Sequence, residues 1–201
     1  MAINASDPPA TTIATPVRFT FEDYVKYTEE HDGSFELRNG VIVRMAPEND
    51  PHGLTRSELA IYLVLHLDLT RFTPFSELSF PCPGWTEGPK PDHFVARGRP
   101  LDQGRRPTSE DIALIIEISS DEERLKDDKN KAETYASVRI PEFWIVDLLH
   151  RNVLLHREHQ GTVYTLIETK RPGETITSTA VEGFAIAVDV LLRHASGAKT
   201  T

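Results

Sequence analysis

Three side chains in this sequence combine the residue types that metal-assisted hydrolysis requires: Asp92, Glu117 and Lys131. Glu117 lies in the apolar run 112–118, IALIIEI, which is typical of a central strand buried on both faces. A carboxylate in such a strand destabilises the fold unless it is paired or coordinated. Asp92 begins a further candidate strand after Pro91, and Lys131 lies in the charged helix expected after the Glu117 strand.

This set of residues suits a hard cation and a water nucleophile. Mg²⁺ prefers oxygen ligands, keeps several waters and often takes only one or two carboxylates from the protein. A nearby lysine can orient the water or offset charge on a phosphorane-like transition state. The set therefore predicts a site for Mg²⁺- or Mn²⁺-dependent hydrolysis of a phosphate ester.

Each carboxylate also has a purely structural interpretation. Glu117 can be a strand-end residue that is salt-bridged to an arginine, since structural ion pairs are common. Asp92 can be a simple turn residue after a proline, and taken alone that is the better interpretation. Taken from these residues alone, the metal-binding and the structural interpretations both stay open.

Lys131 competes with a second lysine of the same helix. Asp127 lies four residues before Lys131 and Tyr135 four residues after it, so an acid can hold the ammonium and a ring can pack on its stem. Lys129 points about 160° away around the helix and is the fallback. The alternative for Lys131 is a solvated position in a run of charges.

The segment 35–45, FELRNGVIVRM, predicts a β-hairpin. Asn39-Gly40 fits a two-residue type I′ turn, and apolar residues alternate on both sides of it. Glu36 projects from the face opposite its apolar neighbours. It is either a further acidic member of the site or an exposed cross-strand partner of Arg38 or Arg44.

The remaining pattern predicts an α/β fold with a mixed central sheet flanked by helices. The chain should form one domain over 18–195, with a disordered tail over 1–17 and a flexible tail over 196–201. A long helix from about 52 to 69 is apolar nearly all round in its second half, which predicts cover on several sides. The other expected elements are a short helix capped by Thr20, strands at 76–80, 91–96 and 112–118, a helix at 121–137, a strand at 142–149 and a meander at 152–158 and 162–168.

The composition limits the range of partners. The formal net charge of −9 opposes a broad electrostatic grip on nucleic acid, but it leaves room for a local basic groove around an acidic metal site. No apolar run approaches the roughly 18 residues of a membrane span, and the N-terminal pattern is not that of a signal peptide. The lone Cys82 cannot form an internal disulfide, so a cytoplasmic location is expected.

Several blocks of the sequence, in order, resemble the Uma-two family of restriction endonucleases, within the PD-(D/E)xK nuclease superfamily. The blocks are FELRNGVIVRMAP from residue 35, His52, Pro91-Asp92, LIIEISS at 114–120 and DDKNKAETYASVRIPEFWIVD at 127–147. Together they span most of residues 19–158, and the last block is the most specific. A lone Pro-Asp pair carries no information, whereas several blocks in the right order and spacing do.

The resemblance implies a restriction-endonuclease-like core with a defined ligand set. Asp92 and Glu117 would bind the metal, and the backbone carbonyl of Ile118 would be a third ligand. Glu36 would be an additional acidic ligand or would support one. His52 occupies a position where family members often carry a histidine, and it either contacts a phosphate or metal-bound water or merely opens the long helix.

The sequence departs from the superfamily's simplest motif at one position. That motif places its lysine two residues after the glutamate, where this chain has Ser119. The family that the chain resembles takes its lysine from the following helix, and Lys131 is the matching residue. The other histidines show no zinc-like spacing, namely His31, His93, His150, His156 and His159.

The leading hypothesis is an endonuclease that hydrolyses phosphodiester bonds in nucleic acid, by analogy DNA, and leaves a 5′-phosphate and a 3′-hydroxyl. It would act with Mg²⁺ or Mn²⁺, without a membrane, and as a homodimer. The first alternative is a nuclease fold that serves as a binding or regulatory module without hydrolytic activity, which the net charge of −9 favours. The second is hydrolysis of another phosphate ester, such as RNA or a nucleotide.

Overall fold

The computed structural model describes residues 18–84 and 86–195, so the two expected tails lie outside the described residues. The helices are α1 (Phe21–Glu30), α2 (Asp50–His66), α3 (Glu122–Ser137) and α4 (Val188–Leu191), with a 3-10 turn at Leu101–Gln103. The strands are β1 (Phe35–Arg38), β2 (Val41–Arg44), β3 (Phe72–Ser76), β4 (His93–Arg97), β5 (Ile112–Ser119), β6 (Glu142–Asp147), β7 (Asn152–Gln160), β8 (Val163–Lys170), β9 (Thr175–Thr177) and β10 (Ala185–Ala187).

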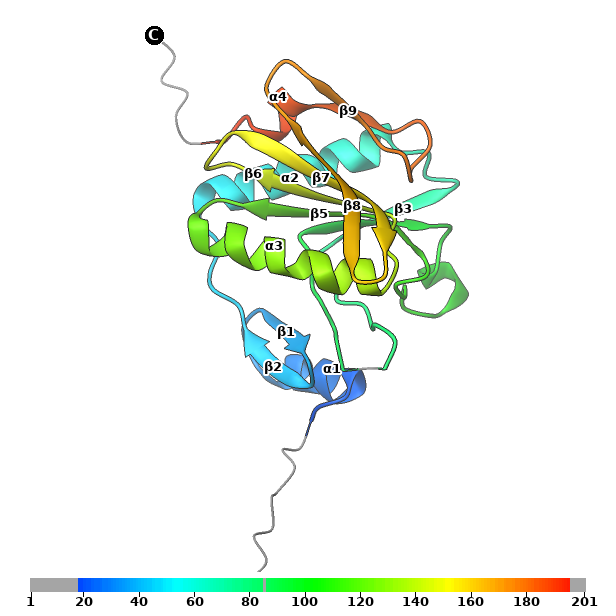
Figure 1. Ribbon diagram of the computed structural model, residues 1–201. Coiled ribbons are helices and arrows are strands. Elements are labelled where there is room, and N and C mark those ends of the chain that lie inside the picture. The colour runs from blue at the N-terminus through cyan, green and yellow to red at the C-terminus, as the bar shows by residue number, and fades with distance from the viewer. Residues whose placement is uncertain (1–17, 85, 196–201) are drawn as a thin grey trace, which may run out of the picture.

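The central sheet is mixed, as the sequence predicts. Its strand order is β3-β4-β5-β6-β7-β8, and β5 and β6 are parallel while the other neighbouring pairs are antiparallel. The parallel pair needs a crossover, which α3 supplies (Figure 1). The α1 helix and the β1-β2 hairpin lie together below the sheet in Figure 1, and we call these two elements the N-terminal lobe.

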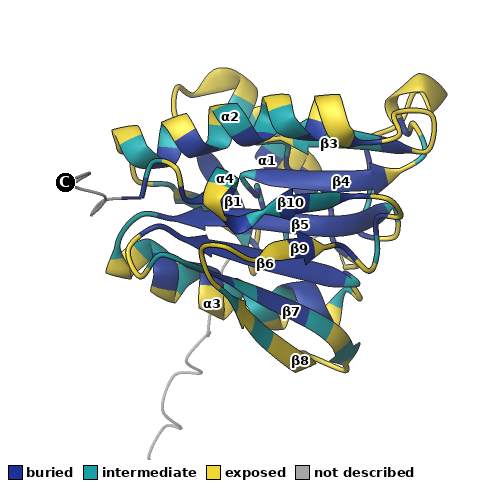
Figure 2. Ribbon diagram, turned by 90° about the horizontal axis from the view of Figure 1, so that it is seen from above, coloured by how far each residue is buried: buried dark blue, intermediate teal, exposed yellow. Residues whose placement is uncertain are grey.

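Two hydrophobic layers fix the helices on opposite faces of the sheet, whose central strands are buried (Figure 2). One layer joins α2, α4 and the β9-β10 pair to the sheet, and the other joins α3 to the opposite face. Ile116 and Ile118 of β5 face the first layer, and Ile115 faces the second. Because side chains alternate along a strand, Glu117 lies on the face that α3 covers.

The local signals around the N-terminal lobe are confirmed. Thr20 and Asp23 form a reciprocal capping box at the start of α1. Asn39 and Gly40 have φ angles of 49° and 74°, which are both positive as a type I′ turn requires.

The lobe is attached to the loop before β4 through a close backbone approach. Leu37 and Gly88 exchange two backbone hydrogen bonds of 3.2 and 2.8 Å. A Cβ on Gly88 would lie 2.8 Å from the ring of Phe21, so glycine is required for this contact.

Two expectations from the sequence, one about β3 and one about α2, were wrong. The strand expected at 76–80 lies at Phe72–Ser76, where Phe72 is buried and pairs with Arg97. Pro74 interrupts the alternating pattern that would identify this strand in the sequence, and it is tolerated because β3 is an edge strand.

The α2 helix is not covered on several sides, because Ile61 and Leu65 are 62% and 72% exposed. None of the described helices is both long and apolar enough to cross a bilayer.

Glu142 is a second fully buried carboxylate in a central strand, and it has a structural role. It accepts hydrogen bonds from Trp144 Nε1 (2.9 Å), Arg157 Nε (2.8 Å) and Ser178 Oγ (2.5 Å). The backbone amides of Thr179 and Ala180 donate to it as well. These donors tie β6 to β7 and to the segment after β9, so this acid is fully satisfied within the fold.

We expect Glu142→Gln to lower the free energy of unfolding by about 3 kcal/mol, because it removes the fully buried charge partner of Arg157 and leaves that guanidinium only the more exposed Glu168. Urea unfolding measures this loss. The control is Glu168→Gln, which removes the more exposed partner of the same arginine and should cost less than about 1 kcal/mol. Equal effects of the two substitutions would contradict this role of Glu142.

Candidate active site

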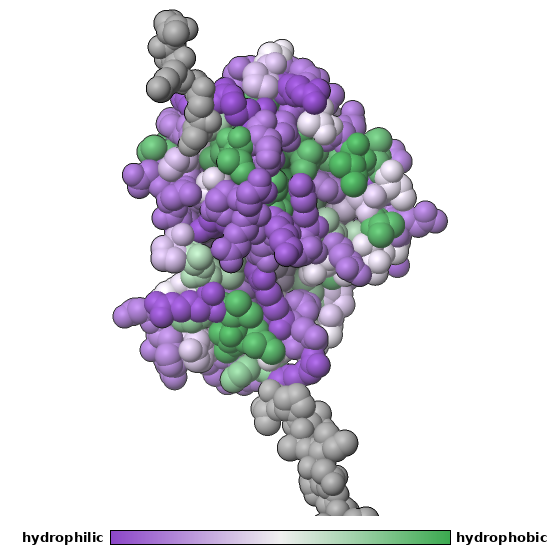
Figure 3. Space-filling model, turned by 60° about the vertical axis from the view of Figure 1, so that its left-hand side comes forward, coloured by the Kyte–Doolittle hydropathy of each residue, from purple (hydrophilic) through white to green (hydrophobic). Residues whose placement is uncertain are grey.

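An open cleft of about 1150 Å³ separates the N-terminal lobe from α3 and the adjoining ends of β4 and β5. Its described lining includes all four sequence-predicted acidic and basic side chains, namely Glu36, Asp92, Glu117 and Lys131, together with Ile118. Figure 3 shows hydrophilic side chains across the middle of one face, between the main body and the smaller lobe.

Glu117 is the most enclosed carboxylate of the cleft. Its Oε1 accepts hydrogen bonds from Tyr135 Oη (2.7 Å) and Lys131 Nζ (2.9 Å), and its Oε2 accepts from the backbone N–H of Asp92 (3.1 Å). Burial raises the pKa of Glu117 well above its usual range, and the ammonium of Lys131 only partly opposes this shift. The ionised form of Glu117 therefore gains from any further positive charge.

Lys131 reaches the site from α3 and stands among several carboxylates. Its Nζ lies 2.9 Å from Glu117, 3.3 Å from Asp128 and 3.4 Å from Glu36. Burial by itself lowers the pKa of Lys131, but Glu117 and the other carboxylates outweigh burial and raise it well above its usual value. The ammonium is therefore charged. Asp127, the partner expected from the helix spacing, is farther away at 4.0 Å.

Asp92 joins the ends of two neighbouring strands. Its Oδ2 accepts from the backbone N–H of Ile118 (2.7 Å) and contacts His52 Nε2 at 3.1 Å. Burial opposes ionisation, yet the contacts with His52 and the Ile118 amide lower the pKa of Asp92. The N–H and C=O of one strand residue point to the same side, so the Ile118 carbonyl also faces the side of Asp92.

Glu36 is not an exposed cross-strand partner of an arginine, because it is buried and its contact Arg38 lies on the same strand. It is 2% exposed, its Oε2 accepts from Arg38 Nη2 (2.6 Å), and its Oε1 lies 3.4 Å from Lys131 Nζ. The same Arg38 donates two hydrogen bonds of 2.7 Å to Asp127 of α3. Arg38 therefore links the hairpin to α3, while Glu36 faces the interior of the cleft.

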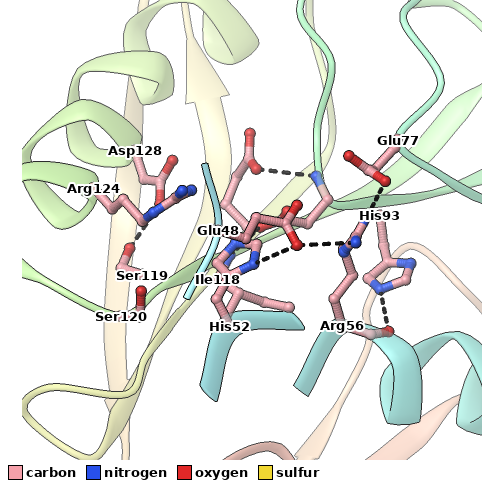
Figure 4. Close-up of polar contacts among 12 residues, drawn as sticks. Glu48, His52, Arg56, Glu77, His93, Ile118, Ser119, Ser120, Arg124 and Asp128 are labelled. Atoms are coloured by element: carbon pink, nitrogen blue, oxygen red, sulfur yellow. Dashed lines mark hydrogen bonds and ion pairs between the residues drawn. The ribbon is translucent and has the colours of Figure 1, made fainter. Parts of the chain in front are cut away.

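His52 lies at the side of Asp92, in the first turn of α2, and is 1% exposed. Glu48, which precedes the helix, lies 3.4 Å from His52 Nδ1, and Arg56 contacts the same carboxylate at 2.9 Å (Figure 4). One donor atom from each of Glu48, His52 and Asp92 lies within 4.8 Å of the others, a spacing that a metal ion can bridge.

The fallback lysine does not reach this cluster. Lys129 is exposed and lines a shallow hollow on the outer side of α3 with Leu125 and Asn130. Two residues correspond to a large rotation around a helix, so Lys129 and Lys131 lie on different surfaces of α3.

Three members of the cluster were not assigned to it from the sequence: Glu48, Asp128 and Tyr135. Asp128 precedes Lys131 by three residues on one helix, so helical neighbour spacing was the available signal for it, whereas Glu48 lies before the N-cap of α2 and had no such signal. The sequence predicted only that the Tyr135 ring packs on the stem of Lys131. It is fully buried, and its hydroxyl is directed at Glu117.

Comparison with known proteins agrees with this fold. A crystal structure of a putative nuclease belonging to DUF820 from Anabaena variabilis superposes with a TM-score of 0.65. That alignment has 18% sequence identity and covers 89% of this chain and 99% of the other, so the likeness is one of fold. No curated protein matches the sequence. The Uma2 family, described as "Putative restriction endonuclease", matches residues 21–189. The chain therefore belongs to the Uma2 family.

Proposed function

We propose that this protein is a metal-dependent endonuclease that hydrolyses phosphodiester bonds, with DNA as the substrate. One observation carries the proposal: the buried ammonium of Lys131 lies within 3.4 Å of Glu36 and Glu117, beside Asp92, in an open cleft. Membership of a family described as putative restriction endonucleases supports it. A cytoplasmic location, where nucleic acid is accessible, is part of the same proposal.

The donor set of the cleft fits a divalent cation. Nine acidic and six basic side chains occur among the described residues that line it, which leaves a formal charge of −3. Asp92 and Glu117 offer carboxylate oxygens, which Mg²⁺ and Mn²⁺ prefer. In this proposal the Ile118 carbonyl is a third ligand and Glu36 a fourth or a supporting acid. A bound ion would polarise the phosphate and lower the pKa of a coordinated water.

The chain's own residues supply positioning and charge. Lys131 is held so that its ammonium can orient a water or offset negative charge that develops on the phosphate. Tyr135 fixes the orientation of Glu117 by donating to Oε1. Exposed Arg44 and Lys126 line the cleft and provide a local basic surface for a phosphate backbone, although the chain as a whole is acidic.

A binding or regulatory module without hydrolytic activity is the second candidate. Both oxygens of Glu117 already accept hydrogen bonds from the protein, an arrangement that a catalytically silent fold can also keep. The net charge of −9 favours this alternative too. The assembly of Asp92, Glu117 and Lys131 in one open cleft favours the enzyme.

We also propose that two copies pair through α2. Leu54, Ile61 and Leu65 are 51%, 62% and 72% exposed, and their spacing places them on one face of the helix. An apolar stripe of this kind can pack on its own copy across a twofold axis. Pairing would let two acidic chains enclose a duplex.

Metal binding is the first test of the proposed site. Wild-type protein should bind Mg²⁺ in a calorimetric titration, and Asp92→Asn should weaken binding at least about tenfold because a charged ligand becomes neutral. Asp102→Asn, which alters an exposed acid paired with Arg99, is the matched control and should bind as the wild type does. Absence of Mg²⁺ binding by the wild type, or unchanged binding by Asp92→Asn, would count against the site.

Cleavage separates the enzyme from the silent module and identifies the lysine. With Mn²⁺ and supercoiled plasmid, Lys131→Ala should slow cleavage by about 100- to 1000-fold, the usual cost of losing one charge-stabilising donor. Lys129→Ala should cleave at the wild-type rate, because that lysine points away from the cleft. Parallel incubations with RNA and nucleotides define the substrate class. No cleavage of any substrate by the wild type would favour the binding module.

Sedimentation tests the pairing. The wild type should sediment as a dimer at micromolar concentration, and Leu65→Glu should sediment as a monomer because it places a charge in the apolar stripe. Val163→Glu is the control, since Val163 is 56% exposed but lies on β8, away from α2. A monomeric wild type would remove this proposal.

A further inference from the structure

His52 is a buried imidazole placed between two carboxylates. Its Nε2 lies 3.1 Å from Asp92 Oδ2 and its Nδ1 lies 3.4 Å from Glu48 Oε2. The backbone N–H of His52 donates to the N-cap residue Asn49, so the start of α2 holds the ring in place. Figure 4 shows the Glu48 carboxylate between His52 and Arg56, with contacts to both.

The two ring nitrogens of His52 differ in how they are satisfied. Asp92 is an acceptor, so Nε2 carries the proton that it accepts. Nδ1 is buried and has no hydrogen-bond partner among the described residues. In the neutral ring its lone pair therefore faces the oxygen of Glu48, another electron-rich atom. Glu48 is partly exposed and Arg56 Nη2 already lies 2.9 Å from the same oxygen, so the unsatisfied group is the buried Nδ1 lone pair, which a cation between the two atoms would satisfy.

We propose that His52 Nδ1 and Glu48 Oε2 are the protein ligands of a second divalent-cation site, and that Asp92 holds the imidazole in place through Nε2–H. Metal–donor distances of about 2.1 Å place adjacent donors about 3.0–3.4 Å apart, which matches the Nδ1–Oε2 separation. Metal-binding histidines commonly donate their other ring N–H to a carboxylate, as Nε2 does to Asp92. The imidazole donor selects Mn²⁺, Co²⁺ or Zn²⁺ over Mg²⁺.

The charges around Glu48 are compatible with a cation there. Arg56 contacts Glu48 at 2.9 Å, but it also pairs with Glu77, so its single charge is shared between two carboxylates. Lys90 lies 3.3 Å from the same Glu77. Arg56, Lys90 and Glu77 together carry a formal charge of +1, whereas Glu48 and Asp92 carry −2. The group as a whole therefore keeps an excess of negative charge.

The charge of the whole cleft points in the same direction. The described lining has a formal charge of −3, so one divalent ion leaves −1 and two ions give +1. The second state attracts an anionic phosphodiester more strongly than the first. Because Asp92 is a ligand of the first site and also orients His52, this inference rests on the proposed function. It assigns the protein two cations, one bound by Asp92 and one on the far side of the His52 ring.

Titration of the full-length protein with Co²⁺, followed by its visible absorption and by calorimetry, tests the site. The wild type should bind two Co²⁺ ions per chain but one Mg²⁺ ion. His52→Gln and Glu48→Gln should each reduce this to one Co²⁺ and remove the absorption change due to the nitrogen ligand. Glu48→Gln should also leave Mg²⁺ binding unchanged. Glu48→Gln alters a partly exposed residue, so it keeps the test valid if His52→Gln fails to fold.

His66→Gln is the matched control, because it removes an exposed histidine from the last turn of the same helix. It should bind both Co²⁺ ions. Glu117→Gln should abolish Mg²⁺ binding and keep the Co²⁺ ion that depends on His52. Failure of the proposed nuclease site would therefore appear as missing Mg²⁺ binding, and failure of the second site as a missing His52-dependent Co²⁺ ion. Wild-type binding of a single Co²⁺ ion that survives both His52→Gln and Glu48→Gln would overturn the inference and assign a proton to Nδ1.

Discussion

The buried ammonium of Lys131 must be neutralised by carboxylates, and these come from three separate elements. Glu117 belongs to β5, Asp128 to α3 and Glu36 to the β1-β2 hairpin. Removal of one partner of a buried charge is strongly destabilising, so the three elements are coupled through this one cation. The position of the N-terminal lobe against the sheet, and hence the shape of the cleft, depends on this coupling.

Buried glutamates occur in both parallel strands, and their surroundings give them different roles. Glu142 of β6 receives donors from side chains and backbone on every side, so it stabilises the fold without further partners. Glu117 of β5 lies at a cleft among other acids, and burial raises its pKa. An acid held in this way is stabilised in its charged form by added cations, which is the physical basis for expecting a metal at this cleft.

The structure also explains how a lysine can reach the site from the helix. Ser119 occupies the place where the simplest superfamily motif has its lysine, and its short side chain donates to Asp128 at 2.7 Å. Asp128 in turn lies 3.3 Å from Lys131 Nζ. A small hydroxyl at the strand end thus leaves space for the ammonium of α3 and helps to orient one of its carboxylate partners.

The sequence by itself determined the local structure and the set of candidate residues. Asn39-Gly40 predicted the hairpin, Thr20 the helix cap, and strand alternation the side on which Glu36 emerges, because each depends on a few consecutive residues. Only the tertiary structure decided which side chains meet. The contacts of Asp92 with His52 and of Glu117 with Tyr135 join residues 40 and 18 positions apart, and the exposure of α2 depends on what packs against it. Such contacts follow from the packing of whole elements, which no local pattern encodes.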